Sequence, residues 1–213
     1  MIPVNPSAHE LLALALYRIG ALQFGEFTLK SGISSPFYID MRLLVSAPEV
    51  LEQAADALFQ ITQNLVYDRL AAIPYAALPI GVALSLRTRK PLVYVRKERK
   101  DYGTAKQIEG NYLAGERLLL IDDVITRGDS KLEAIAPLTA AGLRIIDIAV
   151  LLDRESGGVT MLEARGYRVH AVLTLTEMIT ILHEAAKIEA EQYQSVLDWL
   201  RKPVSYGLGQ AGE

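Results

Sequence analysis

Two adjacent acids, Asp122 and Asp123, separate an apolar run at residues 118–121 from a turn at residues 126–130 that contains hydroxyl groups and a glycine. The apolar run predicts a short buried strand, and a helix is predicted to follow the turn. The backbone N–H groups and the dipole of a helix N-terminus attract an anion such as a phosphate. The two carboxylates are badly placed for that anion and suit the hydroxyl groups of a sugar instead. The stretch therefore predicts a sugar-phosphate site; the alternative is an ordinary strand-to-helix turn whose acids only complement the helix dipole.

Spacing typical of capping boxes predicts where several helices begin. The pairs are Ser7 with Glu10, Ser46 with Glu49, and Ser130 with Glu133. These helices are expected to end near residues 22, 63 and 141, and Gly142 suits the C-terminal stop of the third. Thr176 is predicted to cap a later helix that runs to about residue 184, and residues 190–199 predict an amphipathic helix.

Composition and charge exclude several classes of function. The chain has 213 residues, 51% of them hydrophobic, and a formal net charge of −3, so neither a nucleic-acid-binding surface nor a basic membrane-binding surface is expected. No apolar run approaches the roughly 18 residues that span a bilayer, and the N-terminus lacks the features of a signal peptide. The absence of cysteine excludes disulfides, thiol catalysis and thiolate metal sites. His9, His170 and His183 have no zinc-site spacing, and we expect a cytoplasmic protein.

Apolar segments alternate with predicted helices from residue 70 onward. Strands are predicted at residues 70–73, 92–95, 118–121, 145–152 and 169–175. The pattern predicts an α/β fold with a mostly parallel twisted sheet flanked by helices on both faces. Ligands bind at the carboxyl ends of such strands, where the loops that follow them are expected to meet. The predicted units are residues 1–66 for N-terminal helices and a small hood of two short strands, 67–203 for the α/β core with its C-terminal helix, and 204–213 for a flexible tail.

Residues 118–130 resemble the motif that binds 5-phosphoribosyl 1-diphosphate (PRPP) in the type I phosphoribosyltransferase family: an apolar strand, two acids, two apolar residues, then Thr-x-Gly-x-Ser. Residues 96–110 read RKERKDYGTAKQIEG, which by composition alone is either a functional lid or a solvated surface loop. Its R-K-E-x-K-D-Y-G portion resembles the catalytic loop of orotate phosphoribosyltransferases. The hood motifs F-T-L-K-S-G and S-P-F-Y-I-D-x-R and the loop L-D-R-E-x-G-G resemble the same family. The turn at residues 74–79 is similar to the transferase half of UMP synthase, and with no room for a decarboxylase domain a stand-alone enzyme is expected.

The resemblance implies a role for each matching residue. PRPP binding is implied for the cationic loop and the motif: Arg96, Lys97, Lys100, Tyr102, Asp122, Asp123, Val124, Ile125, Thr126, Arg127, Gly128, Asp129 and Ser130. Orotate binding is implied for positions in the hood, the turn and a later loop: Lys30, Phe37, Tyr38, Thr126 and Arg154. Catalytic roles are implied for Lys97, Lys100, Asp122 and Asp123. For Phe37 and Tyr38 the alternative is core packing, and for Arg154 it is an ion pair with a neighbouring acid, Asp153 or Glu155.

The activity implied by the resemblance is transfer of the 5-phosphoribosyl group from PRPP to orotate, which gives orotidine 5′-monophosphate and diphosphate in pyrimidine biosynthesis. Breaking the anomeric C–O bond leaves an oxocarbenium-like ribose, so no protein nucleophile is needed. Mg²⁺ is the implied cofactor, held mainly by diphosphate and ribose oxygens with no direct protein ligand. The implied assembly is a homodimer in which the catalytic loop reaches the partner subunit.

Arg127 and Asp129 depart from the small or hydroxyl residues that are usual in this turn of the family. The carboxylate of Asp129 weakens phosphate binding unless it points away or pairs with Arg127 or Lys131. Tyr102 and Ala76 stand where some other members carry His and Lys. Two other activities stay open on this fold: a PRPP-binding regulator, against which the net charge counts, and a phosphoribosyltransferase for another base. A catalytically impaired relative, motivated by Asp129, is a third alternative.

Overall fold

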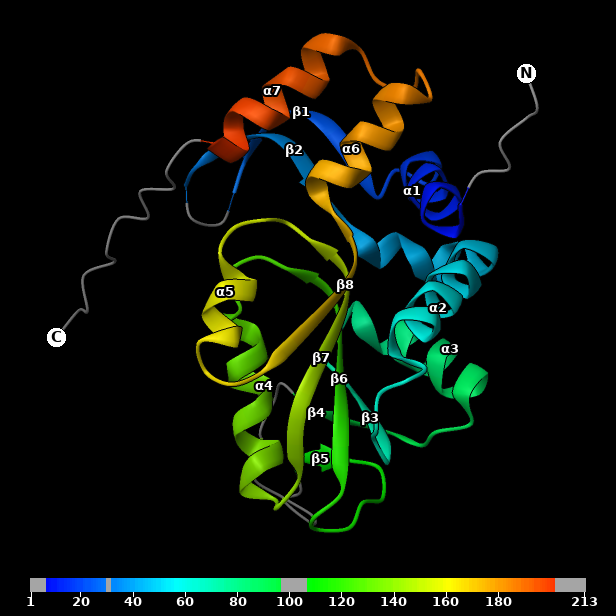
Figure 1. The fold of residues 1–213 in the computed structure, drawn as a ribbon, viewed down its shortest axis with the longest axis vertical. Coiled ribbons are helices and arrows are strands. Elements are labelled where there is room, and N and C mark those ends of the chain that lie inside the picture. Colours follow the sequence, from blue (N-terminus) through cyan, green and yellow to red (C-terminus); the bar gives the residue numbers. More distant parts are fainter. Residues whose placement is uncertain (1–6, 30–31, 97–106, 202–213) are drawn as a thin grey trace, which may run out of the picture.

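A six-stranded sheet lies between two layers of helices in the computed structural model, which describes residues 7–29, 32–96 and 107–201 (Figure 1). In spatial order the strands are β5 (Ile108–Glu109), β4 (Leu92–Val95), β3 (Arg69–Ala72), β6 (Arg117–Ile125), β7 (Arg144–Asp153) and β8 (Arg168–Thr174). Neighbouring strands are parallel except β4 and β5, which are antiparallel. The predicted parallel α/β sheet is confirmed, and β5 is an addition that the sequence pattern does not predict.

Helices cover both faces of the sheet (Figure 1). One face carries α2 (Pro48–Thr62) and α3 (Ala77–Thr88), and the other carries α4 (Asp129–Ala140) and α5 (Gly158–Glu163). Alternate residues of β6 enter the two cores, because successive side chains of a strand point to opposite faces. Leu119 packs with α2 and α3, whereas Leu118 and Leu120 pack with α4 and α5. In the described part of the chain, no helix combines the length and the apolar character needed to cross a bilayer.

A hairpin, a 3-10 helix and three α-helices form a cap over the carboxyl ends of the strands, and we call this cap the hood (Figure 1). It consists of β1 (Leu22–Thr28) paired antiparallel with β2 (Ser34–Ile39), then the 3-10 helix η1 (Met41–Ser46), together with α1 (Ala8–Arg18), α6 (Leu175–Glu184) and α7 (Ala190–Arg201). Helix α7 lies against the hairpin, where Nε1 of Trp199 donates a hydrogen bond to the backbone oxygen of Ser34 over 2.9 Å. Segments from both ends of the described chain therefore build the hood.

The structure describes two capping boxes, one of them at a predicted position. Ser7 and Glu10 form the predicted box of α1. Thr174 and Glu177 form the box of α6, so the prediction that Thr176 caps this helix is wrong. Glu177 decides which threonine is the N-cap, because a capping box requires an acid three residues after the cap, and Glu177 stands three residues after Thr174.

The boxes predicted at Ser46 and Ser130 are wrong. Helix α2 follows Ala47 and has Pro48 at its first position, where the missing N–H costs nothing and the fixed φ suits a helix. Helix α4 follows Gly128, which adopts a φ of +88°. Ser130 therefore lies inside the first turn of α4 rather than at its cap.

Asp147 of β7 is buried beside β8 and is satisfied by two side chains of that strand. Its carboxylate accepts a hydrogen bond from Nη2 of Arg168 at 2.7 Å and lies 2.8 Å from Nε2 of His170. Burial alone would raise the pKa of Asp147, but the hydrogen bonds from Arg168 and His170 outweigh it and lower the pKa below its ordinary value. Such a carboxyl stabilises the fold above its unfolded pKa, and this contribution is lost as the pH falls through the folded pKa.

Asp147→Asn is expected to lower the free energy of unfolding by about 1–3 kcal/mol at pH 7, because it removes charge-assisted hydrogen bonds. The difference from the parent protein should shrink below about pH 4, where ordinary Asp carboxyls take up protons. Urea unfolding at several pH values measures it. Asp198→Asn, which removes an exposed pair with Arg201, is the control and should change the free energy by less than about 0.5 kcal/mol. A difference that does not shrink between about pH 4 and pH 2 would contradict the assignment.

Candidate functional site

The acid pair lies inside β6 rather than after it. Pairing of β6 with β3 ends where Ala72 meets Ile121, whereas pairing with β7 continues until Ile125 meets Asp153. The predicted end of the strand at residue 121 is therefore wrong, because β7 keeps the chain extended through both acids. From β3 the chain moves outward to β4, and from β6 it moves the other way to β7. The acids thus lie at the crevice where the strand order reverses, which is where open α/β sheets bind ligands.

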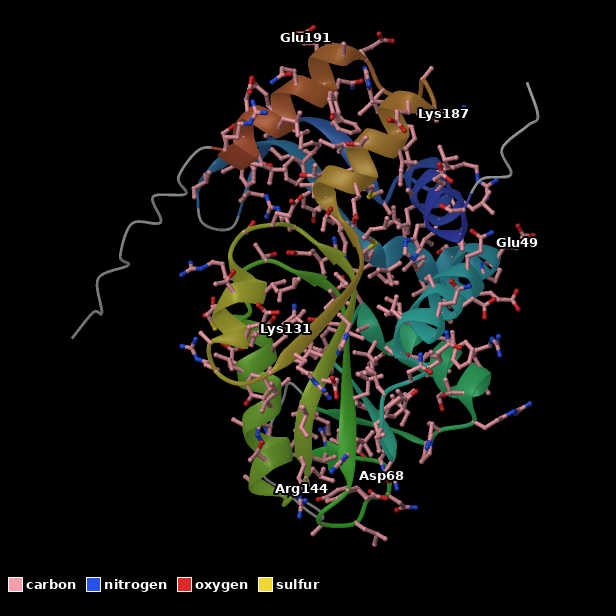
Figure 2. The ribbon with its side chains drawn as sticks, in the orientation of Figure 1. Glu49, Asp68, Lys131, Arg144, Lys187 and Glu191 are labelled. Carbon is pink, nitrogen blue, oxygen red and sulfur yellow. The ribbon has the colours of Figure 1, made fainter. Side chains whose placement is uncertain are left out.

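Asp122 faces α4 and forms a buried ion pair with Lys131. Nζ of Lys131 lies 2.6 Å from Oδ2 of Asp122 and donates a second hydrogen bond to the backbone oxygen of Val124 at 2.5 Å. Asp122 is 6% exposed and Lys131 is 3% exposed. Figure 2 labels Lys131 at the end of α4 nearest the hood, and Asp68 and Arg144 at the opposite end of the sheet. The first turn of α4 is therefore tied directly to the strand that carries the acids.

Asp123, in contrast, lines a cleft beneath the hood. Burial raises the pKa of Asp123 to about 7, and the negative charge of Asp122 adds to this rise. The cation of Lys131 offsets part of the effect. The two adjacent acids therefore differ in chemistry: Asp122 has a cation in contact, whereas Asp123 exchanges a proton near neutral pH.

The turn between β6 and α4 is held against α5. A Cβ on Gly128 would come within 2.5 Å of the Cε atom of Met161. The N–H of Gly158 donates to the backbone oxygen of Thr126 at 3.0 Å, and a Cβ on Gly158 would lie 2.6 Å from that oxygen. The backbone of the loop at residues 153–158 thus packs directly on the predicted phosphate turn. No described side chain caps α4, so the positive end of its dipole is directed at this turn.

Arg127 and Asp129 are the exposed charged residues of the turn. Nε of Arg127 lies 3.7 Å from Oδ2 of Asp129, and both side chains are more than half exposed. Of the two alternative partners considered for Asp129, Arg127 forms the ion pair, whereas Lys131 pairs with Asp122. An exposed pair of this kind contributes only about 0–1 kcal/mol to stability. The pair acts mainly on the charge of the turn, because Arg127 offsets the negative charge of Asp129 there.

A cleft of about 170 Å³ lies between the hood and the end of β6. Its lining residues come from the hood, the strand, the turn and a loop: Leu29, Phe37, Tyr38, Ile39, Asp123, Val124, Thr126 and Arg154. Six of these eight are predicted site residues, and they come from three segments far apart in the sequence. A wider groove of about 510 Å³ lies between the hairpin and α7, but none of the predicted site residues lines it. The smaller cleft is therefore the candidate site because of the residues that line it and not because of its volume.

The two aromatic residues predicted for the site differ in exposure. Phe37 is 1% exposed, so core packing holds for this ring, which also forms part of the cleft wall. Tyr38 is 37% exposed and stacks on Phe27 with ring centres 5.5 Å apart. The hydroxyl of Tyr38 accepts a hydrogen bond from Nη2 of Arg42 at 3.2 Å, which fixes the outer edge of the cleft.

Arg154 reaches the cleft from the loop after β7. Its backbone N–H donates to the oxygen of Ile125 at 2.9 Å, and its guanidinium carbon lies 4.9 Å from the ring centre of Phe37. The acids on either side of it hold other groups. Asp153 accepts the N–H of Glu155 at 2.8 Å, and Glu155 accepts an N–H of the first turn of α6 at 2.6 Å. These acids therefore stabilise the loop that carries Arg154.

Four predicted site residues lie outside the described residues: Lys30, Lys97, Lys100 and Tyr102. Arg96, at the start of the cationic segment, is described. Its N–H donates to the oxygen of Gln107 at 2.9 Å, and its guanidinium lies 3.5 Å from Glu109 of β5. Over residues 7–29, 32–96 and 107–201, no group of three or more His, Asp and Glu side chains is arranged to hold a metal ion.

A family model described as a phosphoribosyl transferase domain matches residues 44–163. The orotate phosphoribosyltransferase of Pyrobaculum aerophilum is 37% identical over 186 residues, which cover 87% of this chain and 95% of that protein. The chain belongs to the phosphoribosyltransferase family. The bifunctional enzyme PyrF/PyrE of Nostoc sp. is 43% identical over 185 residues, which are 87% of this chain but 39% of that protein. The structure of Leishmania donovani UMP synthase matches with a TM-score of 0.85 and 39% identity, over 91% of this chain and 42% of that chain. The chain thus spans about two fifths of the length of these two longer relatives.

Lys131 is a residue of the candidate site that none of the motifs identifies, because lysine is rarely buried. Its position nevertheless carries a signal. Residues 131, 134, 135 and 138 share helical spacing, and the last three are the buried apolar residues Ala134, Ile135 and Leu138. A lysine at an apolar position of a helix that follows two acids therefore indicates a buried counter-ion.

Lys131→Met is expected to lower the free energy of unfolding by about 3–5 kcal/mol, because it leaves the carboxylate of Asp122 buried without its cation. The double variant K131M/D122N should be more stable than K131M, since both charges are then absent. Urea titrations of the parent, both single variants and the double variant give the interaction energy. Lys187→Met, at an exposed lysine, is the control and should change stability by no more than about 0.5 kcal/mol. A double variant no more stable than K131M would show that the pair is assigned wrongly.

Gly158→Ala is expected to displace the phosphate turn and to lower the free energy of unfolding by about 1–3 kcal/mol, because the new Cβ overlaps the backbone oxygen of Thr126. Gly157→Ala is the matched control: no described atom lies within 4 Å of a Cβ there, so only the strain of its φ of +85°, about 1–2 kcal/mol, applies. Crystal structures of the two variants measure the position of Thr126. The close approach is refuted if Thr126 stays in place in both.

Proposed function

We propose that this chain transfers the 5-phosphoribosyl group from PRPP to orotate, releasing orotidine 5′-monophosphate and diphosphate. One observation carries the proposal: a single cleft brings Asp123 and Thr126, from the sugar-phosphate motif, together with Arg154 and the aromatic residues of the hood. The names of the relatives, orotate phosphoribosyltransferase and UMP synthase, support the choice of substrates. We also propose a homodimer in the cytoplasm, acting in pyrimidine biosynthesis.

At the PRPP end, the 5′-phosphate is proposed to bind the turn that contains Thr126, Gly128 and Ser130, at the positive end of the α4 dipole. Val124 and Ile125 supply the strand end that leads into it. Asp123 is the carboxylate proposed to accept the ribose hydroxyls from the cleft side. Asp122 acts from the opposite face of β6, where Lys131 neutralises it and fixes its position.

The exposed turn residues Arg127 and Asp129 flank the proposed phosphate position. Arg127 is proposed to contribute a cation there, and its pairing with Asp129 reduces the repulsion that the carboxylate would otherwise exert. A carboxylate in this turn is therefore compatible with phosphate binding.

At the orotate end, Arg154 is proposed to receive the carboxylate of orotate. The guanidinium is planar and presents paired N–H groups, so it matches a planar carboxylate with two parallel hydrogen bonds. Phe37 and Tyr38 are proposed to pack against the pyrimidine ring from the hood, with Lys30 as a further contact.

The chemistry requires stabilisation of charge rather than a nucleophile from the protein. Positive charge develops on the ribose as the anomeric bond breaks, and the carboxylate of Asp123, which lines the cleft, stabilises it. Negative charge leaves with the diphosphate, which the cations Arg96, Lys97 and Lys100 are proposed to bind, with Tyr102 beside them. Closure of this cationic loop, contributed in part across the dimer, excludes water that would hydrolyse PRPP. The rise of the pKa of Asp123 to about 7 means that its ionised fraction increases through neutral pH.

Mg²⁺ is proposed to enter with PRPP, held by diphosphate and ribose oxygens. The donor set fits this arrangement, because Asp122 already has a cation as its partner and no cage of acids surrounds the cleft among the described residues. Mg²⁺, when bound, would supply positive charge for the diphosphate leaving group. The residues of the turn then need only orient the phosphate and the sugar.

Loss of orotate absorbance that depends on both PRPP and Mg²⁺ tests the activity. Arg154→Gln is expected to raise the KM for orotate about 100-fold and to change the KM for PRPP less than about twofold, because charge-assisted hydrogen bonds contribute about 1.5–3 kcal/mol each. Arg165→Gln, an exposed arginine on the neighbouring helix, is the control and should match the parent protein. Turnover with a purine base but not with orotate would assign another transferase activity. PRPP binding without any turnover would indicate a regulator or an impaired enzyme.

A further inference from the structure

Arg154 lies in a corner formed by two aromatic rings. Its guanidinium carbon is 4.9 Å from the ring centre of Phe37 and 4.9 Å from that of Trp199. The two rings are 5.2 Å apart and nearly perpendicular, at 84°. The three centres therefore form a nearly equilateral triangle, which means that both rings lie on the same side of the guanidinium. The other sides of the guanidinium include the side that faces the cleft, which Arg154 lines.

Trp199 is held in this corner by the helix that carries it and by a hydrogen bond from its indole. It belongs to α7, whose Val196 is fully buried in the main core. Its Nε1 donates to the backbone oxygen of Ser34, in the same strand as Phe37. Trp199 also borders the wide groove between the hairpin and α7 but not the smaller cleft. The indole thus stands behind Arg154, as seen from the cleft.

We propose that Trp199 is a positioning residue for Arg154: together with Phe37, it holds the guanidinium in the orientation in which its N–H edge meets the carboxylate of the acceptor base. The inference rests on the proposed function, and it adds a residue from the C-terminal helix to the recognition of a planar, carboxylate-bearing ring. An acceptor without that carboxylate gains nothing from the arrangement.

Three physical effects make the corner useful. A guanidinium over an aromatic face is attracted by the ring quadrupole, and tryptophan gives the strongest interaction of this type. An arginine side chain that is already ordered loses less conformational entropy when it binds, so more of the hydrogen-bond energy appears as affinity. The indole also keeps water from one side of the guanidinium, which strengthens a charge-assisted hydrogen bond on the other. These effects act on the acceptor and leave the phosphate turn unchanged.

The test compares Trp199→Leu with Trp199→Phe in the full chain. W199L removes the ring, and the KM for orotate is expected to rise about tenfold, while kcat and the KM for PRPP stay within about twofold. W199F loses the hydrogen bond to Ser34 but keeps a ring, so its KM for orotate should lie close to that of the parent protein. Leu197→Ala is the control for a loosened helix, because Leu197 packs against the main core on α7. It should lower the melting temperature and leave the KM for orotate near the parent value.

Fluorescence gives a readout that does not depend on turnover. Trp199 is the single tryptophan of the 213 residues, so the tryptophan emission, excited selectively beyond the absorption of tyrosine, reports this corner alone. Arg154→Gln should change the emission of the protein without substrates, and orotate should change the emission of the parent protein in a saturable manner. If orotate is not a substrate but R154Q still alters the emission, the proposed function fails while the contact stands. The inference is overturned if W199L keeps the parent KM for orotate, or if the KM values for orotate and PRPP rise together.

Discussion

The buried ion pair between Lys131 and Asp122 is the constraint on which the rest of the site depends. Burying two charges costs several kcal/mol per ion unless they are well paired and hydrogen-bonded. Here the 2.6 Å pair is completed by a hydrogen bond from Lys131 to the oxygen of Val124, so the ammonium holds a side chain and the backbone of one strand. The first turn of α4 cannot move away from β6 without exposing an uncompensated carboxylate. The intervening turn, which ends at Gly128, is held in shape as a consequence.

The same pair gives two adjacent and identical residues different properties. Asp122 and Asp123 differ only in the face of β6 to which they point, yet the first has a cation and the second is desolvated in the cleft. Burial and the charge of Asp122 together raise the pKa of Asp123 to about 7. A carboxyl that ionises near neutral pH responds to what enters the cleft, since a neighbouring positive charge favours its ionised form. The developing charge on a ribose is a stimulus of that kind.

The sequence predicts the parallel sheet, the edge at which the site lies and the motif that fills it, because apolar runs and motif spacing are local properties. The N-cap of α4 could not be predicted in this way, since it is Gly128, whose φ of +88° favours glycine and whose turn packs against α5, and not Ser130 of the capping pattern. Lysine is expected at the surface, so the helical spacing of Lys131 with apolar residues is only an indirect signal, and its pairing with Asp122 is defined once α4 is docked on the sheet. Trp199 meets Ser34 across 165 positions of sequence, and no local pattern carries such a contact.

The proposed site therefore has two parts: one is formed by residues that are close together in the sequence, and the other by residues that are far apart in it. The sugar-phosphate part comes from one continuous stretch of β6 and α4, so its geometry follows from a single strand-to-helix connection. The acceptor part is assembled from Phe37 of β2, Arg154 after β7 and Trp199 of α7, and it exists only when both ends of the described chain pack in the hood. Substitutions in the hood can therefore alter the choice of acceptor without disturbing the sheet or the phosphate turn. The physical reason is that the hood touches the acceptor side of the cleft, while the ion pair that shapes the turn lies on the opposite face of β6.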